Sequence, residues 1–256
     1  MKQLLKKYLL IFPFLGLLIF MGCNTEDAPD CFQTAGKIIE KDFVVDAFDE
    51  LIVYEDIELF IEQGAKHSVV VKTGENLMNE ISAEVVDGRL ILRNDNGCNF
   101  VRDYDVTSIY VTAPNLTWLQ NAGNRVIKSV GELHFKNIWL RSLNQERAKG
   151  VYTVGDFDLH LISDHVRVTG DDFSNFFLRG ETDYLNLFMA NGDGRVEARE
   201  LKAGTVEIQH RGTNKLIVNP QQVLKGEIRS TGDVISVNRP PVVEVEVFYS
   251  GRLIFE

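Results

Sequence analysis

Apolar and polar residues alternate along most of the chain after Phe43, which is the pattern of half-buried β-strands. In residues 57–62 the isoleucines and leucine fall on one face and the two glutamates on the other. Asp87-Gly88 separates two further alternating runs and predicts a hairpin turn, because both residues tolerate positive φ. Only residues 75–81 suit a short helix, and Asn76 and Asn79 weaken even that one. The pattern predicts an all-β protein.

The second half of the chain repeats. Short apolar-x-apolar strands recur at intervals of 22, 21, 26, 21 and 22 residues, and the long interval contains an extra stretch, 176–184. This period predicts a β-helix, or β-solenoid, of about six coils over residues 106–255, with the β-rich part 43–105 as an N-terminal cap and the last strands as a C-terminal cap. The predicted coils start at Leu116, Ile138, Leu159, Leu185, Val206 and Ile228.

The alternation within each coil supports this register. The residue two positions after each coil start is apolar in five of the six coils, so we expect it to face inward. The residue one position after each coil start is polar in five of the six coils, so we expect it to face outward. Trp139 is the one large apolar residue in the outward column. An exposed Trp139 beside His160 could stack on a sugar ring or anchor a protein partner. We therefore take Trp139 and His160 as candidate ligand-binding residues; the alternatives are that a loop covers the indole or that the register slips locally.

The first 22 residues have the layout of an export signal. Three lysines precede an apolar run, 8–21, that is too short to span a bilayer comfortably. Residues 20–23 resemble a bacterial lipobox, so we expect Cys23 to be lipidated and residues 23–42 to form a tether to the outer membrane. An ordinary secretory signal with an incidental cysteine is the alternative.

The net charge of the chain argues against one class of binding partner, and its cysteines suggest a disulfide. The whole chain carries −10, and removal of residues 1–22 leaves 24 Lys and Arg against 37 Asp and Glu, or −13. Such a chain repels polyanions at long range, which argues against a nucleic-acid partner. Cys31 and Cys98 form an even pair in an oxidising compartment, which favours a disulfide; two free, buried thiols are the alternative.

Several segments together resemble one known family, the putative auto-transporter adhesins with a head GIN domain, which are cell-envelope proteins of Bacteroidetes. The similar segments are FDELIV at 48–53, IELFIEQG at 57–64, VVV at 69–71, ENL at 75–77, DGRLIL at 87–92, VTAPNL at 111–116, GDV at 232–234 and YSGRL at 249–253. The resemblance covers residues 43–255. It implies a β-helical, extracytoplasmic protein, and its adhesin label implies a binding role.

Candidate chemistry adds little to this picture. The chain has no HExxH or CxxC motif, so we expect no metal site and no cofactor. The carboxylates that could act as catalytic acids fall in predicted turns, namely Asp156, Asp158, Asp171, Asp172, Glu181, Asp183 and Asp193. Glycan-cleaving β-helices generally need acids stacked in adjacent coils, and in the predicted register no two acids stack five residues after a coil start. We expect a non-enzymatic, lipid-anchored protein that binds a glycan or protein; a structural component of the envelope, or a glycan lyase or hydrolase, are the alternatives.

Overall fold

The computed structural model describes residues 30–97, 99–100, 107–144 and 147–256, and within them the protein is all-β, as expected. Two short 3-10 helices accompany the strands: one precedes the first strand, and the other lies inside the predicted helical stretch 75–81. The elements are η1 (Asp30–Phe32), β1 (Ile38–Phe43), β2 (Glu50–Val53), β3 (Glu58–Gln63), β4 (Ser68–Gly74), η2 (Met78–Glu80), β5 (Ile81–Val86), β6 (Arg89–Asn94), β7 (Ser108–Ala113), β8 (Trp118–Asn121), β9 (Ile127–Leu133), β10 (Asn137–Ser142), β11 (Phe157–Gly170), β12 (Phe176–Met189), β13 (Val196–His210), β14 (Leu216–Ile228), β15 (Val234–Ser236), β16 (Val242–Val247) and β17 (Leu253–Phe255).

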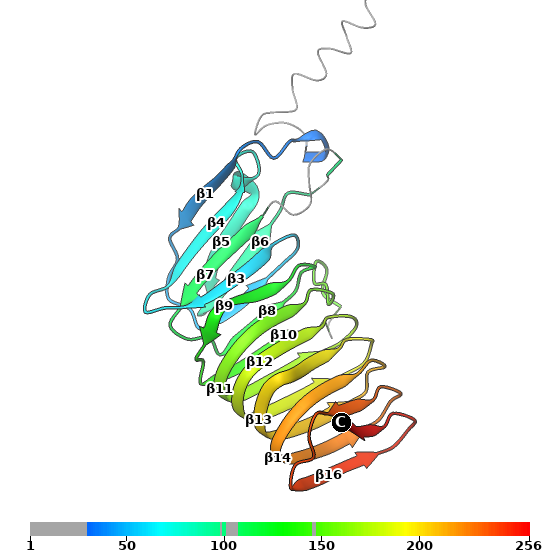
Figure 1. Cartoon of the computed structure of the whole chain (residues 1–256). Helices are drawn as coiled ribbons and strands as arrows, with labels where there is room; N and C mark the ends of the chain where they lie inside the picture. Colours follow the sequence, from blue (N-terminus) through cyan, green and yellow to red (C-terminus); the bar gives the residue numbers. More distant parts are fainter. Residues whose placement is uncertain (1–29, 98, 101–106, 145–146) are drawn as a thin grey trace, which may run out of the picture.

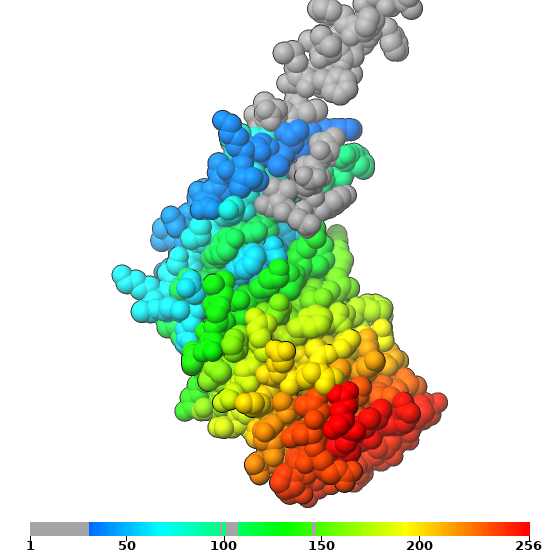
Figure 2. Space-filling model, viewed as in Figure 1, coloured from blue at the N-terminus to red at the C-terminus, as the bar shows by residue number. Residues whose placement is uncertain are grey.

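The strands form two long sheets that run the length of the molecule (Figure 1). The molecule is elongated (Figure 2). Sheet A contains, in order, β1, β4, β7, β3, β9, the first arms of β11 to β14, β15 and β17. Sheet B contains β5, β6, β2, β8, β10, the second arms of β11 to β14, and β16. Pairing is antiparallel in β1–β4–β7 and in β5–β6, and parallel elsewhere.

The four long strands join the two sheets and enclose the core. They contain 13 to 15 residues each, and each turns a corner near its middle, at residues 162–164 in β11. Side chains alternate along both arms, so that the inward ones are buried. Phe157 and Phe176, on adjacent first arms, are fully buried and stacked, with ring centres 4.7 Å apart. Burial of this apolar face holds the two sheets together.

The hairpin and the strand faces of the N-terminal part are confirmed. Asp87 and Gly88 have φ of 51° and 78° and join β5 to β6. Ile57, Leu59 and Ile61 are buried on one face, as the alternation predicts.

The predicted coil starts do not fall in one column, so the count of six coils is not confirmed. Ile138 aligns in sheet B with Val166 of β11, whereas the predicted start Leu159 lies on the other arm of β11 and aligns with Leu178 in sheet A. The stretch 176–184, expected to be an insertion, includes the first arm of β12. The long interval falls instead between the end of β10 at Ser142 and the start of β11 at Phe157. The apolar-x-apolar motif occurs in both arms of a long strand such as β11. The spacing of this motif therefore could not distinguish a start on a first arm from a start on a second arm.

The last strands extend the stack instead of capping it. β16 and β17 each pair with one neighbour, and in the described part of the chain their outer edges carry no further strand. This end of the molecule exposes apolar side chains, namely Val242, Val243, Val247, Phe248 and Tyr249. The expectation of a C-terminal cap was therefore wrong. At the other end, β1 begins at Ile38, so the last part of the predicted tether is the edge strand of sheet A.

Cys31 lies in η1, close to the segment that contains its predicted partner. The backbone N–H of Phe100 donates to the carbonyl oxygen of Cys31 at 3.0 Å, and the Phe32 and Phe100 rings lie 5.9 Å apart. Cys98 lies outside the described residues, so the Cys31–Cys98 bond stays a prediction, one that the nearby backbone contact supports.

One buried imidazole gives a test of the core by pH. His210 is fully buried, its Nε2–H donates to the carbonyl oxygen of Asn214 at 2.9 Å, and its Nδ1 has no partner in the described structure. Burial lowers the pKa of His210, although the Asn214 hydrogen bond and Asp233 oppose the shift. Protonation would place an unsatisfied N–H in the core.

We expect the His210→Gln variant to lose part of the acid sensitivity of the wild type. Below a pH of about 6.5 the unfolded state takes up a proton at His210 and the native state does not, so stability falls as pH falls, by at most about 1.4 kcal/mol per pH unit, until the lower native pKa is reached. Urea unfolding at pH 8 and pH 5.5 measures the difference. An equal pH dependence in both proteins would contradict the assignment.

Candidate functional site

The two tryptophans of the chain lie side by side on the outer face of sheet B. Trp118 of β8 aligns with Trp139 of β10, which aligns with Arg167 of β11. Trp118 is two residues after the predicted coil start Leu116, so the sequence pattern predicted that it faces inward. This prediction is wrong by one residue. Leu116 is buried in the turn before β8, and the alternation restarts at Trp118, so that Leu119 is the inward partner of Leu140.

Trp139 is half-buried by arginines and is not a free aromatic platform. The guanidinium carbons of Arg167 and Arg141 lie 4.1 Å and 4.6 Å from its ring centre. Its indole N–H donates to the hydroxyl of Thr169 at 2.9 Å. The expectation of an exposed indole that stacks on a sugar is therefore corrected, because cation–π contacts already occupy the ring.

Trp118 is more deeply enclosed, at 7% exposure. Arg89 lies 4.2 Å from its ring centre and Arg141 5.4 Å. Together with Ile52 and Ala122, Trp118 forms a small apolar cluster separate from the main core. We call Arg89, Trp118, Trp139, Arg141 and Arg167 the Arg–Trp cluster.

The Arg–Trp cluster holds more positive than negative charge. Glu50 pairs with Arg89 at 2.5 Å, but among the described residues no carboxylate lies within 4 Å of Arg141 or Arg167. Burial, followed by the charges of Arg89 and Arg167, lowers the pKa of Arg141, and Glu50 partly offsets this. The Nε of Arg141 is buried without a hydrogen-bond partner in the described structure. The cluster therefore has unused donors and charge for an anionic group.

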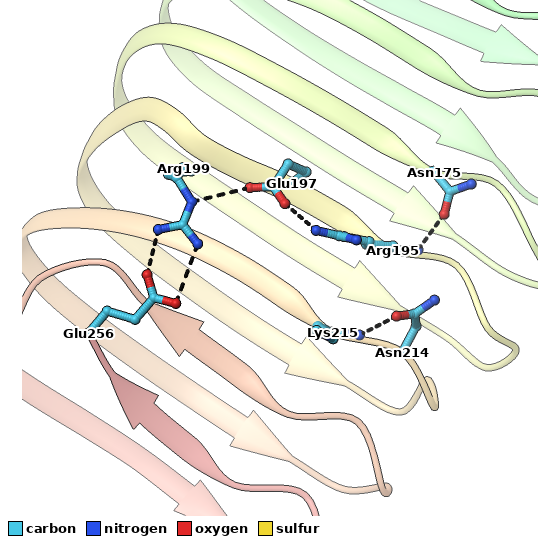
Figure 3. Close-up of polar contacts among 7 residues, drawn as sticks. All are labelled: Asn175, Arg195, Glu197, Arg199, Asn214, Lys215 and Glu256. Carbon is cyan, nitrogen blue, oxygen red and sulfur yellow. Dashed lines mark hydrogen bonds and ion pairs between the residues drawn. The ribbon is translucent and has the colours of Figure 1, made fainter.

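The outer face of sheet A is different, because its arginines alternate with carboxylates (Figure 3). Arg195 pairs with Glu197, which lies 3.8 Å from Arg199, and Arg199 in turn pairs with Glu256 at 2.5 Å. The charges of this row neutralise one another.

His160 lies away from Trp139. It aligns with Glu132 of β9 and Arg179 of β12 in sheet A, and its Nε2 lies 3.7 Å from the Glu132 carboxylate. Trp139 pairs with the second arm of β11, beyond the corner. The structure thus places the two predicted binding residues on different sheets and does not bring them together.

The corner between the two sheets contains a hollow of about 660 Å³, lined by residues that include Asp164 and Asp183. These two carboxylates lie at equivalent positions of β11 and β12, between the aligned pairs Ser163–Thr182 and His165–Tyr184. The prediction that no two acids stack was made in the wrong register and is corrected. Asp164 is 60% exposed and lies 3.9 Å from Lys136.

The sequence contained part of the signal for the Arg–Trp cluster. Trp139 and Arg141 are two residues apart in one strand, so period-two alternation places both on one face. The contributions of Arg89, Trp118 and Arg167 depend on strand pairing across long separations and could not be read from spacing. Cys23, the predicted lipidation site, lies outside the described residues.

The described residues contain neither a metal-binding group nor a membrane-spanning helix. No group of three or more His, Cys, Asp or Glu side chains in this part of the chain is arranged to hold a metal ion. In the same residues, no helix has the length and apolar character needed to cross a membrane.

Comparisons with known proteins identify the family from its sequence model and the fold from solved structures. The family model described as "putative auto-transporter adhesin, head GIN domain" matches residues 47–240. The crystal structure of a putative adhesin from Bacteroides fragilis is similar, with a TM-score of 0.76 and 19% identity over 87% of this chain and 99% of that one. The crystal structure of a putative lipid binding protein from Parabacteroides distasonis is similar with a TM-score of 0.58 and 17% identity. That of a putative adhesin from Parabacteroides merdae is similar with a TM-score of 0.58 and 18% identity. Each of these two alignments covers 86% of this chain and 97% of the other chain. No curated protein matches the chain.

Proposed function

The chain belongs to the head GIN domain family of putative auto-transporter adhesins, and from this premise we propose that it is a non-enzymatic, lipid-anchored protein of the cell envelope that presents a ligand-binding surface. The observation that carries the proposal is the Arg–Trp cluster, a half-exposed group of cations without enough carboxylates, on a chain that is otherwise strongly acidic. Such a cluster costs stability, because like charges repel, and a ligand that neutralises it explains its presence.

The shape of the molecule supports presentation at a surface. η1 and the C-terminus lie at opposite ends of the stack (Figure 1), so a lipid on Cys23 would hold the chain by one end and leave the stack projecting from the outer membrane. We regard the stacked strands as a β-solenoid of about six coils in this role. A solenoid offers extended side faces for binding.

The non-enzymatic part of the proposal takes into account the aligned acids at the corner. A glycosidase needs a general acid held in a shielded site and a second carboxylate at a set distance. Asp164 is mostly exposed and lies beside Lys136, which suits a solvated ion pair better than proton transfer. A purely structural role in the envelope is the second alternative.

We expect Cys23→Ser to abolish palmitate labelling and to release the protein from the membrane fraction, because Cys23 is the predicted acceptor of the lipid. Metabolic labelling and cell fractionation measure both effects. Cys31→Ser is the matched control and should keep its label, since Cys31 lies in the folded part. Labelling that survives in Cys23→Ser would remove the anchor from the proposal.

Accessibility on intact cells separates adhesion from a structural role. An outward-facing protein is cleaved by added protease, and cells that lack it bind less to a ligand-coated surface. Protection from protease, together with unchanged binding, would favour the structural alternative.

A further inference from the structure

We propose that the Arg–Trp cluster binds the sulfate or carboxylate groups of an acidic polysaccharide, with Arg141 and Arg167 as the residues that contact the anion. This inference rests on the proposed function, since it names the ligand class of the same surface.

The charge and hydrogen-bonding state of Arg141 and Arg167 favours an oxyanion. Arg89 already has a partner in Glu50, but in the described structure Arg141 and Arg167 lie against aromatic rings and have no carboxylate within 4 Å. Arg167 is exposed and Arg141 is half-buried, so an oxyanion outside the sheet meets guanidinium nitrogens other than the buried Nε of Arg141. Guanidinium groups match the oxygens of sulfate and carboxylate with two parallel hydrogen bonds.

The tryptophans position these arginines. Trp139 lies close to both guanidinium groups, and its own N–H is held by Thr169. A stacked arginine has lost much of its rotamer freedom before the ligand arrives, which lowers the entropic cost of binding. Trp139 is thus a positioning residue, and the sugar rings need not stack on it.

The form of the surface favours a polymer over a small molecule. Small ligands are usually enclosed in concave sites. The Arg–Trp cluster lies on the outer face of a sheet, whereas the hollow of about 660 Å³ lies at the corner and has lysines and carboxylates in its lining. Toward the C-terminal end of sheet B, the same face carries carboxylates, of which Glu207 and Glu227 are paired with Lys225 and Arg229. An acidic polysaccharide is therefore attracted to the half of the outer face of sheet B that holds the Arg–Trp cluster, and not to the C-terminal half.

The test measures binding of purified full-length protein, in a non-ionic detergent, to dextran sulfate, polygalacturonate and neutral dextran at 0.15 M salt, where charges more than about 8 Å apart are screened. We expect an acidic polysaccharide to bind and neutral dextran not to bind. Arg141→Gln and Arg167→Gln should each weaken binding about tenfold, as loss of a charge-assisted hydrogen bond does. Arg167→Lys should restore only part of the affinity, because lysine lacks the planar fork.

Arg229→Gln is the matched control. Arg229 also lies against an aromatic ring, 4.1 Å from the centre of Phe248, but Glu227 neutralises it. Its replacement should leave binding unchanged. The inference fails if neutral dextran binds as well as the acidic chains, if Arg229→Gln loses as much affinity as Arg167→Gln, or if neither acidic polysaccharide binds. Because surface exposure and lipidation are measured separately, such a failure would leave the proposed function standing.

Discussion

Phe157→Ala is expected to destabilise the protein by about 3–5 kcal/mol, the usual cost of removing a fully buried phenylalanine. The ring is inaccessible to solvent and stacks on Phe176 of the next strand at an interplanar angle of 12°. Its loss removes apolar burial and leaves a cavity between two sheets that cannot close easily, because the parallel ladder of β9, β11 and β12 fixes the backbone on both sides. Urea unfolding followed by circular dichroism measures the change.

Phe173→Ala is the matched control, since Phe173 is 62% exposed, and its cost should stay within about 0.5 kcal/mol. The double variant Phe157→Ala with Phe176→Ala adds a second check. If the stacked pair contributes as the geometry indicates, the sum of the two single effects will differ from the double effect by about 0.5–1.5 kcal/mol. A cost for Phe157→Ala no larger than that of Phe173→Ala would show that the first arms of β11 and β12 do not form the core described here.

Gly226→Ala is expected to cost about 3 kcal/mol or more, as steric strain in a packed interior does. Gly226 has a φ of +121°, which side chains rarely adopt, and a Cβ there would lie 2.0 Å from the carbonyl oxygen of Ile208 on the neighbouring strand. That oxygen belongs to the backbone of β13 and cannot move without breaking the sheet. Thermal and urea unfolding measure the loss.

Gly131→Ala separates the clash from the backbone conformation. Gly131 has a φ of +74°, and an added Cβ would have no neighbour within 4 Å. Only the conformational cost of about 1–2 kcal/mol remains at this position. Equal destabilisation by the two alanine variants would mean that the close approach of β13 to β14 at Gly226 does not exist.

The faces of single strands were predictable because they depend on neighbours two residues apart. The buried face of β3 and the Asp87-Gly88 hairpin follow from local rules that hold in any β-sheet. The coil register was not predictable in the same way. Both arms of a bent strand carry the same apolar-x-apolar motif, and nothing local distinguishes Leu159 in sheet A from Val166 in sheet B.

The candidate site shows the same division. Trp139 was identified from its odd position in an outward column, and its partner Arg141 lies on the same face of the same strand. Its predicted companion His160 lies on the other sheet, because β11 turns a corner between His160 and Arg167. Trp118 and Arg167 join Trp139 only through strand pairs that close long loops.

The sequence by itself determined that this protein is all-β, which side chains face the core along strands such as β3, and which family it belongs to, because these properties reside in short segments and their order. The tertiary structure decided which strands pair, and through them which guanidinium groups meet at Trp139 and which acids align at the corner. In a parallel stack, a shift of one residue reverses the face of a side chain, and a mistaken arm moves it to another sheet. Only the packed core, which every coil must fill at once, sets that register.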